Sequence, residues 1–220
     1  MSNPDSFINE VTEEVRRDRM FALWRRWGPY VIGGIVVIVA LAGAKAWMDA
    51  RTAAEARQAG AAMIAAAEVA PTEAAEALTT LAEQTGNKGA SALARLRAAG
   101  VFAEEGRRAE AVAAYQAVAE NDAVDRPLRE FAAFRAVMTQ APDLTPSALA
   151  EALKPIAEGN GAFRLLALEA QAGALLEAGD VAAATETLRR VVADDATPQG
   201  LRQRAEAVLA AIGAPVDATG

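Results

Sequence analysis

The chain has 220 residues, of which 22 are Lys or Arg and 29 are Asp or Glu, and it contains neither His nor Cys. These absences exclude Ser-His-Asp and Cys-His catalysis, disulfides and ordinary zinc or haem sites, because each needs an imidazole or a thiol. Although 53% of the residues are hydrophobic, roughly half of these are Ala, and aromatic residues make up 5%. Because Ala loses no side-chain entropy in a helix, this composition predicts an all-α protein.

Residues 1–26 form a charged stub that is too short to be a domain. Asn3, followed by a proline, is expected to cap a helix. Phe7, Val11 and Val15 recur every four residues, which predicts a short amphipathic helix leading into the next segment.

Residues 27–48 contain the one long apolar run of the sequence, with no charged residue from Trp27 to Ala44. The 21 residues from Trp27 to Trp47 would make a helix about 32 Å long, which matches a hydrocarbon core of roughly 30 Å. Trp24 and Trp27 precede the run and Trp47 follows it, as expected of rings that settle at the level of the lipid headgroups. We therefore predict a single transmembrane helix.

A cleaved signal peptide is the alternative for this segment. Residues 40–42 and 42–44 both have the Ala-x-Ala pattern of a cleavage site. The long charged leader, the trailing Trp47 and the lack of a helix breaker after Ala44 favour an uncleaved anchor.

Basic residues are denser before the apolar run than after it. The trailing side carries Lys45, Arg51 and Arg57, more thinly spread. By the positive-inside rule, the N-terminus is expected in the cytoplasm and the remainder outside, in the periplasm of a bacterium. The leading side has five arginines within eleven residues: Arg16, Arg17, Arg19, Arg25 and Arg26.

Small residues within the predicted span are candidates for contact with another helix. Gly33, Ala40 and Ala44 lie near one helix face, with Gly43 adjacent. Small side chains let helices approach closely in lipid, although Gly and Ala are common in any spanning segment.

Residues 92–123 and 165–196 repeat one pattern at an offset of 73. They share Leu, Gly, Glu, Val and Asp in one register, which chance in an Ala-rich chain does not readily explain. In each, a helix is expected to end at a glycine, Gly106 or Gly179, because glycine adopts the left-handed conformation cheaply. A second helix follows, so each segment is a helical hairpin that resembles the tetratricopeptide pattern.

Similar hairpins fit before and between these two. Their second helices are expected to begin near residues 72, 109, 146 and 181, with Thr72 and Thr145 as N-caps. A closing helix from Pro198 to Ile212 follows, and residues 213–220 are expected to form a frayed tail. We therefore predict that residues 49–212 form an α-solenoid of about four hairpins plus a closing helix.

First helices in such an array line a concave face, which commonly binds a partner's peptide or domain. Packing within the array is the alternative role for the leucines in these helices. The candidate residues of the face are Leu93, Leu96, Leu166, Glu169 and Leu176.

Charge argues against nucleic acid as a partner. Residues 49–212 carry 16 Lys plus Arg and 23 Asp plus Glu, and an acidic surface repels phosphate. The carboxylates are expected on solvated helix faces and turns, with no cofactor, metal or catalytic site. An enzyme that uses carboxylates or Lys is a minor alternative.

The order of these parts resembles the YfgM-like family of bacterial inner-membrane proteins. The resemblance rests on Trp-Arg-Arg-Trp before one spanning helix and on an Ala-rich repeat domain. From Ala92 to Ile212, Leu-Ala-Arg-Leu-Arg-Ala-Ala-Gly and Thr-Pro-Gln-Gly-Leu-Arg-Gln-Arg-Ala-Glu are similar to the alphaproteobacterial members. It implies an accessory subunit of the Sec translocon that associates with periplasmic chaperones and emerging chains. It implies no catalytic residues.

The expected function is therefore that of a non-enzymatic, single-pass inner-membrane protein whose periplasmic domain binds proteins. A scaffold or assembly factor for another inner-membrane complex, such as a respiratory one, is the alternative. The oligomeric state stays open.

Overall fold

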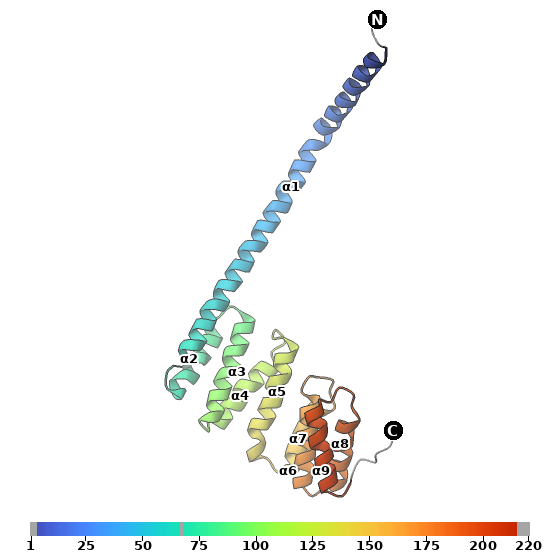
Figure 1. Ribbon diagram of the computed structural model, residues 1–220. Coiled ribbons are helices and arrows are strands. Elements are labelled where there is room, and N and C mark those ends of the chain that lie inside the picture. Colours follow the sequence, from blue (N-terminus) through green and yellow to red (C-terminus); the bar gives the residue numbers. More distant parts are fainter. Residues whose placement is uncertain (1–3, 67, 215–220) are drawn as a thin grey trace. The chain divides into compact units, whose positions relative to one another are not determined.

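The computed structural model describes the backbone of residues 4–66 and 68–214, and the side chains within these ranges from Trp24 onward except that of Thr72. This part of the chain is all-α, as predicted, and contains no strand (Figure 1). The chain divides into two compact units, Met1–Ala54 and Glu55–Gly220. Its helices are α1 (Pro4–Ala66), α2 (Pro71–Gln84), α3 (Lys88–Glu104), α4 (Arg108–Ala119), α5 (Arg126–Gln140), the 3₁₀ turn η1 (Ala141–Asp143), α6 (Pro146–Ala157), α7 (Arg164–Glu177), α8 (Val181–Ala193) and α9 (Gln199–Ala211).

Helix α1 is one continuous element where the sequence suggested three. No break separates the apolar run from the first helix of the array, because the residues after Ala44 are good helix formers. The helix also continues through Pro29, between the stub and the run. Asn3 and the side chains of residues 7, 11 and 15 lie outside the described residues.

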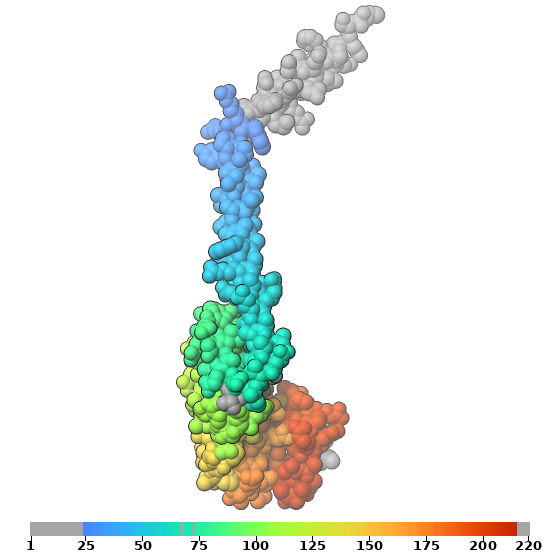
Figure 2. Space-filling model, turned by 90° about the vertical axis from the view of Figure 1, so that its left-hand side faces the viewer, coloured from blue at the N-terminus to red at the C-terminus, as the bar shows by residue number. Residues whose placement is uncertain are grey.

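The apolar part of α1 is long and apolar enough to cross a membrane, and it is the one such helix among the residues described. Its side chains are exposed within the first unit (Figure 2): Trp24, Trp27 and Trp47 are each at least 60% exposed. The guanidinium of Arg51 lies 5.9 Å from the centroid of the Trp47 ring.

The second helices of the hairpins begin close to where they were predicted. They start at Pro71, Arg108, Pro146 and Val181. The Thr145 hydroxyl accepts a hydrogen bond from the Ala148 amide at 3.2 Å, which confirms its role as N-cap. Thr72 is not a cap, because Pro71 occupies the first helical position and Ala70 the cap.

Three glycines end helices in the left-handed conformation. Gly106 and Gly179 have φ of 76° and 82°, as predicted, and Gly213 has 75°. The amide after each donates back across the last turn, for example from Asp180 to the Leu175 carbonyl at 2.9 Å. This pattern is the Schellman motif, which satisfies carbonyls at the helix end. Gly213 therefore closes α9 instead of opening a tail, and residues 215–220 lie outside the described residues.

The core of the second unit consists of three apolar clusters. One joins the end of α1 to α2, α3 and α4, a second joins α3, α4 and α5, and a third joins α6, α7, α8 and α9. Helix α5 contributes to two of them, because Ala132 and Ala136 face the second cluster while Phe134 and Val137 face the third.

Residues related by the offset of 73 occupy equivalent positions in the core. The small residues that let helices approach are buried in both copies, and so are the apolar residues between them. The pairs that are at most 1% exposed are Ala94 and Ala167, Ala99 and Ala172, Ala111 and Ala184, and Val118 and Val191.

Candidate protein-binding groove

The five residues predicted for the concave face fall into different environments. Leu93 and Leu166, which are repeat equivalents, are 49% and 40% exposed. Leu96 is 9% exposed and belongs to the cluster of α3, α4 and α5. Its side chain is core packing and not an accessible surface, because α5 covers it.

Three of the five predicted residues lie on one face of α7. Leu166, Glu169 and Leu176 are separated by three and seven residues, which places them on one side of a helix. They line two neighbouring pockets whose other wall is α9. Leu93 lines neither pocket. We call this surface the α7/α9 groove and define it by Leu166, Glu169, Gly173, Leu176, Arg204 and Val208.

The two pockets of the groove differ in size. The larger, of 620 Å³, lies between Leu166 and the start of α9 at Pro198 and Gly200. The smaller, of 220 Å³, lies between Gly173 and Leu176 on α7 and Val208 on α9. Both are lined largely by apolar groups, which suits side chains of a bound polypeptide better than a charged ligand.

An ion pair crosses the groove between the pockets. Arg204 donates from Nε and Nη2 to the two carboxylate oxygens of Glu169, at 2.7 and 3.0 Å. Hydrogen bonding to Glu169 raises the pKa of Arg204 above its ordinary value. The carboxylate predicted for the concave face is therefore held by its own chain. It does not present an uncompensated charge to a ligand.

A second ion pair supports the mouth of the larger pocket. Arg164, at the start of α7, donates from Nη2 to the Asp194 carboxylate at 2.5 Å. Asp194 also accepts from the Ala196 amide at 2.8 Å. The hydrogen bond from Arg164, followed by that amide, lowers the pKa of Asp194 below its ordinary value.

Sequence reasoning missed Arg164 and Arg204 as groove residues. The signal that was available is the offset of 73, which makes Arg204 the equivalent of Phe131. A charged residue in place of an aromatic one marks the position where the two copies differ.

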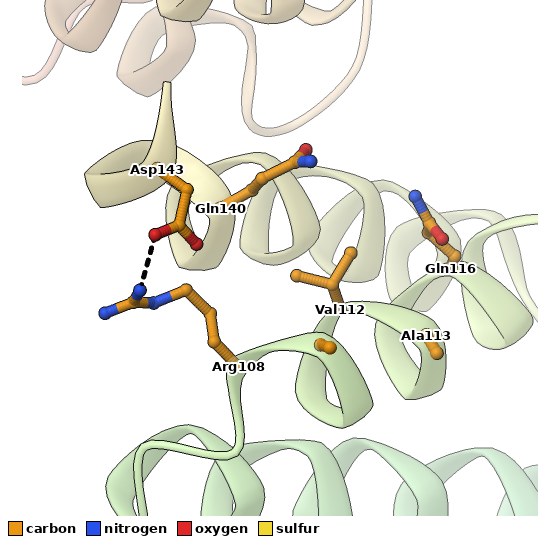
Figure 3. Close-up of a pocket in the computed structure, with 7 residues that line it drawn as sticks. Arg108, Val112, Ala113, Gln116, Gln140 and Asp143 are labelled. Atoms are coloured by element: carbon orange, nitrogen blue, oxygen red, sulfur yellow. Dashed lines mark hydrogen bonds and ion pairs between the residues drawn. The ribbon is translucent and has the colours of Figure 1, made fainter. Parts of the chain in front are cut away.

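A further pocket, of 360 Å³, lies between α4 and the end of α5 (Figure 3). Arg108 donates from Nη1 to Asp143 at 2.7 Å across its mouth, and Gln116 and Gln140 add amides to the lining. Each of these three pockets is lined by at most one carboxylate. They lack the converging acids that carboxylate catalysis needs.

The small residues predicted for helix contact in the apolar segment are all exposed. A Cβ added to Gly33 or Gly43 would meet no atom within 4 Å outside the helix's own backbone. Ala40 and Ala44 are likewise uncovered. Their role in helix association stays a prediction.

No group of three or more Asp or Glu side chains able to hold a metal ion occurs among the residues described. Ion pairs account for several of the carboxylates of the array, including Glu110, Asp122 and Glu169.

Comparison with known proteins gives one result. Residues 22–161 match the family model described as a tetratricopeptide repeat-like domain, which covers more than half of the chain. Among curated proteins and solved structures, no match was found. The matched range contains the apolar part of α1 and ends before α7, so the α7/α9 groove lies outside it.

Proposed function

Because the chain belongs to the tetratricopeptide repeat-like domain family, whose helical repeats are typically non-catalytic interaction modules, we propose that it is a membrane-anchored protein-binding protein. More narrowly, we propose that it is a YfgM-like protein of alphaproteobacterial type. It acts as an accessory subunit of the Sec translocon and connects the translocon to periplasmic chaperones or to emerging chains.

One observation carries this proposal: an exposed apolar helix with aromatic residues at both ends precedes a repeat array in the same chain. The anchor confines the array to the membrane and raises the effective concentration of weak contacts with membrane partners. A free array would gain nothing from a helix that must be shielded from water.

In the proposed arrangement, residues 1–26 are cytoplasmic and residues 27–48 span the inner membrane uncleaved. Residues 49–212 form the periplasmic array. The excess of arginine before the span supports this orientation, because cations are retained on the cytoplasmic side. The acidic array suits basic or unfolded clients.

Photo-crosslinking in native membranes tests the proposal. A photoreactive amino acid at Leu166, which is exposed in the groove, is expected to capture translocon subunits or a periplasmic chaperone. The same amino acid at Glu186, an exposed position on α8 outside the groove, is the matched control. Recovery of a single respiratory complex without translocon subunits would overturn the translocon assignment in favour of an assembly factor.

A further inference from the structure

The α7/α9 groove has a counterpart in the first copy of the repeat. The offset of 73 relates α7 and α9 to α3 and α5. Gly173 corresponds to Gly100, so the floor is glycine in both copies. The walls differ, because Glu169, Leu188, Arg204 and Val208 stand where the first copy has Leu96, Tyr115, Phe131 and Arg135.

In the first copy, the chain's own large side chains fill the corresponding space. Phe131 packs against the cluster that holds the buried Leu96. Tyr115 is 2% exposed, and its hydroxyl oxygen lies 3.9 Å from the position of a Cβ on Gly100. The guanidinium of Arg135 lies 5.5 Å from the Tyr115 ring centroid and covers it.

In the second copy the same space is open. A Cβ on Gly173 would meet no atom within 4 Å outside the backbone of α7 itself, because Leu188 is shorter than tyrosine and Val208 shorter than arginine. The smaller pocket lies over this glycine. Arg204, in the place of the phenylalanine, is turned to the Glu169 carboxylate and is itself exposed.

We propose that the α7/α9 groove binds a large apolar side chain, preferably aromatic, from an unfolded or extended segment of a partner polypeptide. This side chain occupies the space that Tyr115, Phe131 and Arg135 fill in the first copy. It contacts the surface of α7 at Gly173. The inference deepens the proposed protein-binding function and rests on it. It names the surface and the chemistry of the bound segment.

The array of a second copy exposes no such ring among the residues described. The exposed aromatic residues among those described are Trp24, Trp27, Tyr30 and Trp47, which lie in or beside the apolar segment of α1. From Glu55 to Ala214, the exposed large hydrophobic side chains of the described residues are aliphatic or Met. We therefore assign the ring to another polypeptide.

Fluorescence anisotropy with labelled peptides tests the proposal. The full-length protein is placed in lipid nanodiscs, since detergent would compete for an apolar groove. The probes are two 12-residue fluorescein peptides of Ser, Gly and Gln, one with two Phe residues and one with Ser in their place. The Phe peptide is expected to bind at least about tenfold more tightly, because burial of a ring stabilises the complex.

Two variants plug the groove. Gly173→Leu fills the smaller pocket without meeting another atom near its Cβ, and Val208→Arg restores the residue of the first copy. Each is expected to weaken Phe-peptide binding by at least about tenfold. Ala207→Leu, on an exposed position of α9, adds the same side chain outside the groove and is expected to leave binding unchanged. Circular dichroism and thermal unfolding of each variant establish that it is folded.

Binding of the Phe peptide to folded Gly173→Leu and Val208→Arg within twofold of wild type would overturn the groove assignment. The protein-binding function would stand, because capture of membrane partners is measured separately. Equal binding of the Ser peptide, or no binding of either peptide to wild type, would also overturn the proposal. So would self-association that Gly173→Leu abolishes, since the occupant would then be a second copy.

Discussion

Glu130 on α5 ties the loop between α6 and α7 to the rest of the array. Its carboxylate accepts a hydrogen bond from the Ala162 amide at 2.9 Å and one from Arg126 Nε at 2.6 Å. Arg126 also donates from Nη2 to the Asn160 side chain in the same loop. The loop passes so close that a Cβ on Gly161 would lie 2.6 Å from the carboxyl carbon of Glu130. One side chain therefore positions the segment that leads into the groove.

We expect Glu130→Gln to lower the free energy of unfolding by about 1 kcal/mol near neutral pH, because it removes a charged acceptor from a partly buried site. The amide of Ala162, then Arg126, lowers the pKa of Glu130 below its ordinary value of 4.5. A carboxylate whose pKa is lower in the folded than in the unfolded protein stabilises the fold at pH values above its unfolded pKa. That stabilisation is lost as the pH falls through the folded pKa. The difference between wild type and variant is therefore expected to shrink as the pH falls below about 4.5.

Urea denaturation followed by circular dichroism at several pH values measures this difference. Glu151→Gln is the control, because that carboxylate is 77% exposed and lies 3.9 Å from Lys154. It should change stability little at any pH. An equal loss of unfolding free energy in both variants would contradict the role given to Glu130. So would a difference between wild type and Glu130→Gln that grows as the pH falls.

Two glycines near the end of one hairpin helix have opposite roles at the scale of the element. Gly173 lies inside α7 with ordinary helical backbone, where glycine costs conformational entropy. Gly179 follows the helix with φ of 82° and donates its amide to the Leu176 carbonyl at 3.0 Å. The first glycine leaves space for a ligand, and the second ends the helix.

We expect Gly179→Ala to destabilise the array by about 1 kcal/mol, because an L-residue is strained in the left-handed region. Gly173→Ala should instead be neutral or stabilise by up to about 1 kcal/mol, because its Cβ meets no atom within 4 Å outside the backbone of α7. Urea midpoints of the two variants test this contrast within one helix and its cap. A loss of stability in Gly173→Ala would mean that the groove is filled in the folded protein.

Elements of this fold were predictable where proline and glycine mark their ends. Pro146 after Thr145 and the glycines at 106 and 179 place helix boundaries by local backbone preference alone. The continuity of α1 was only partly predictable in this way. The residues after Ala44 are good helix formers, whereas Gly28 and Pro29 favour a break before the apolar run that the structure does not show.

The groove was partly predictable, because helical spacing identifies a face but not what covers it. Leu166, Glu169 and Leu176 share a face of α7, as the spacing indicated, and line the groove. Leu96 has the equivalent position in α3 and lies in the core, because α5 carries Phe131 where α9 carries Arg204. Leu96 and Phe131 belong to one packed region but are 35 residues apart in sequence. The local pattern of one helix does not indicate packing over that separation.

At the scale of the whole molecule, the proposed function combines an apolar anchor with a groove of modest size. A single buried ring gives weak affinity, because the gain from its apolar area is offset by the entropy lost on binding. Attachment to the membrane compensates, since partners in the same membrane meet the array at high effective concentration. We therefore expect the anchor to determine crosslinking to membrane partners and the groove to determine peptide affinity.

Release of the second unit from the membrane separates these contributions. The released chain begins at Glu55, where the second unit starts. It thereby keeps Met63 and Ala66 of α1, which pack against the core of α2, α3 and α4. Exported as a periplasmic protein without the apolar segment, this unit should bind the Phe peptide as tightly as the full chain does. Crosslinking to membrane partners from Leu166 should fall at least about tenfold, because the encounter becomes bimolecular in three dimensions. Equal crosslinking from the released and anchored forms would mean that the anchor is dispensable for partner binding, and a loss of peptide affinity would contradict the assignment of the binding site to the α7/α9 groove.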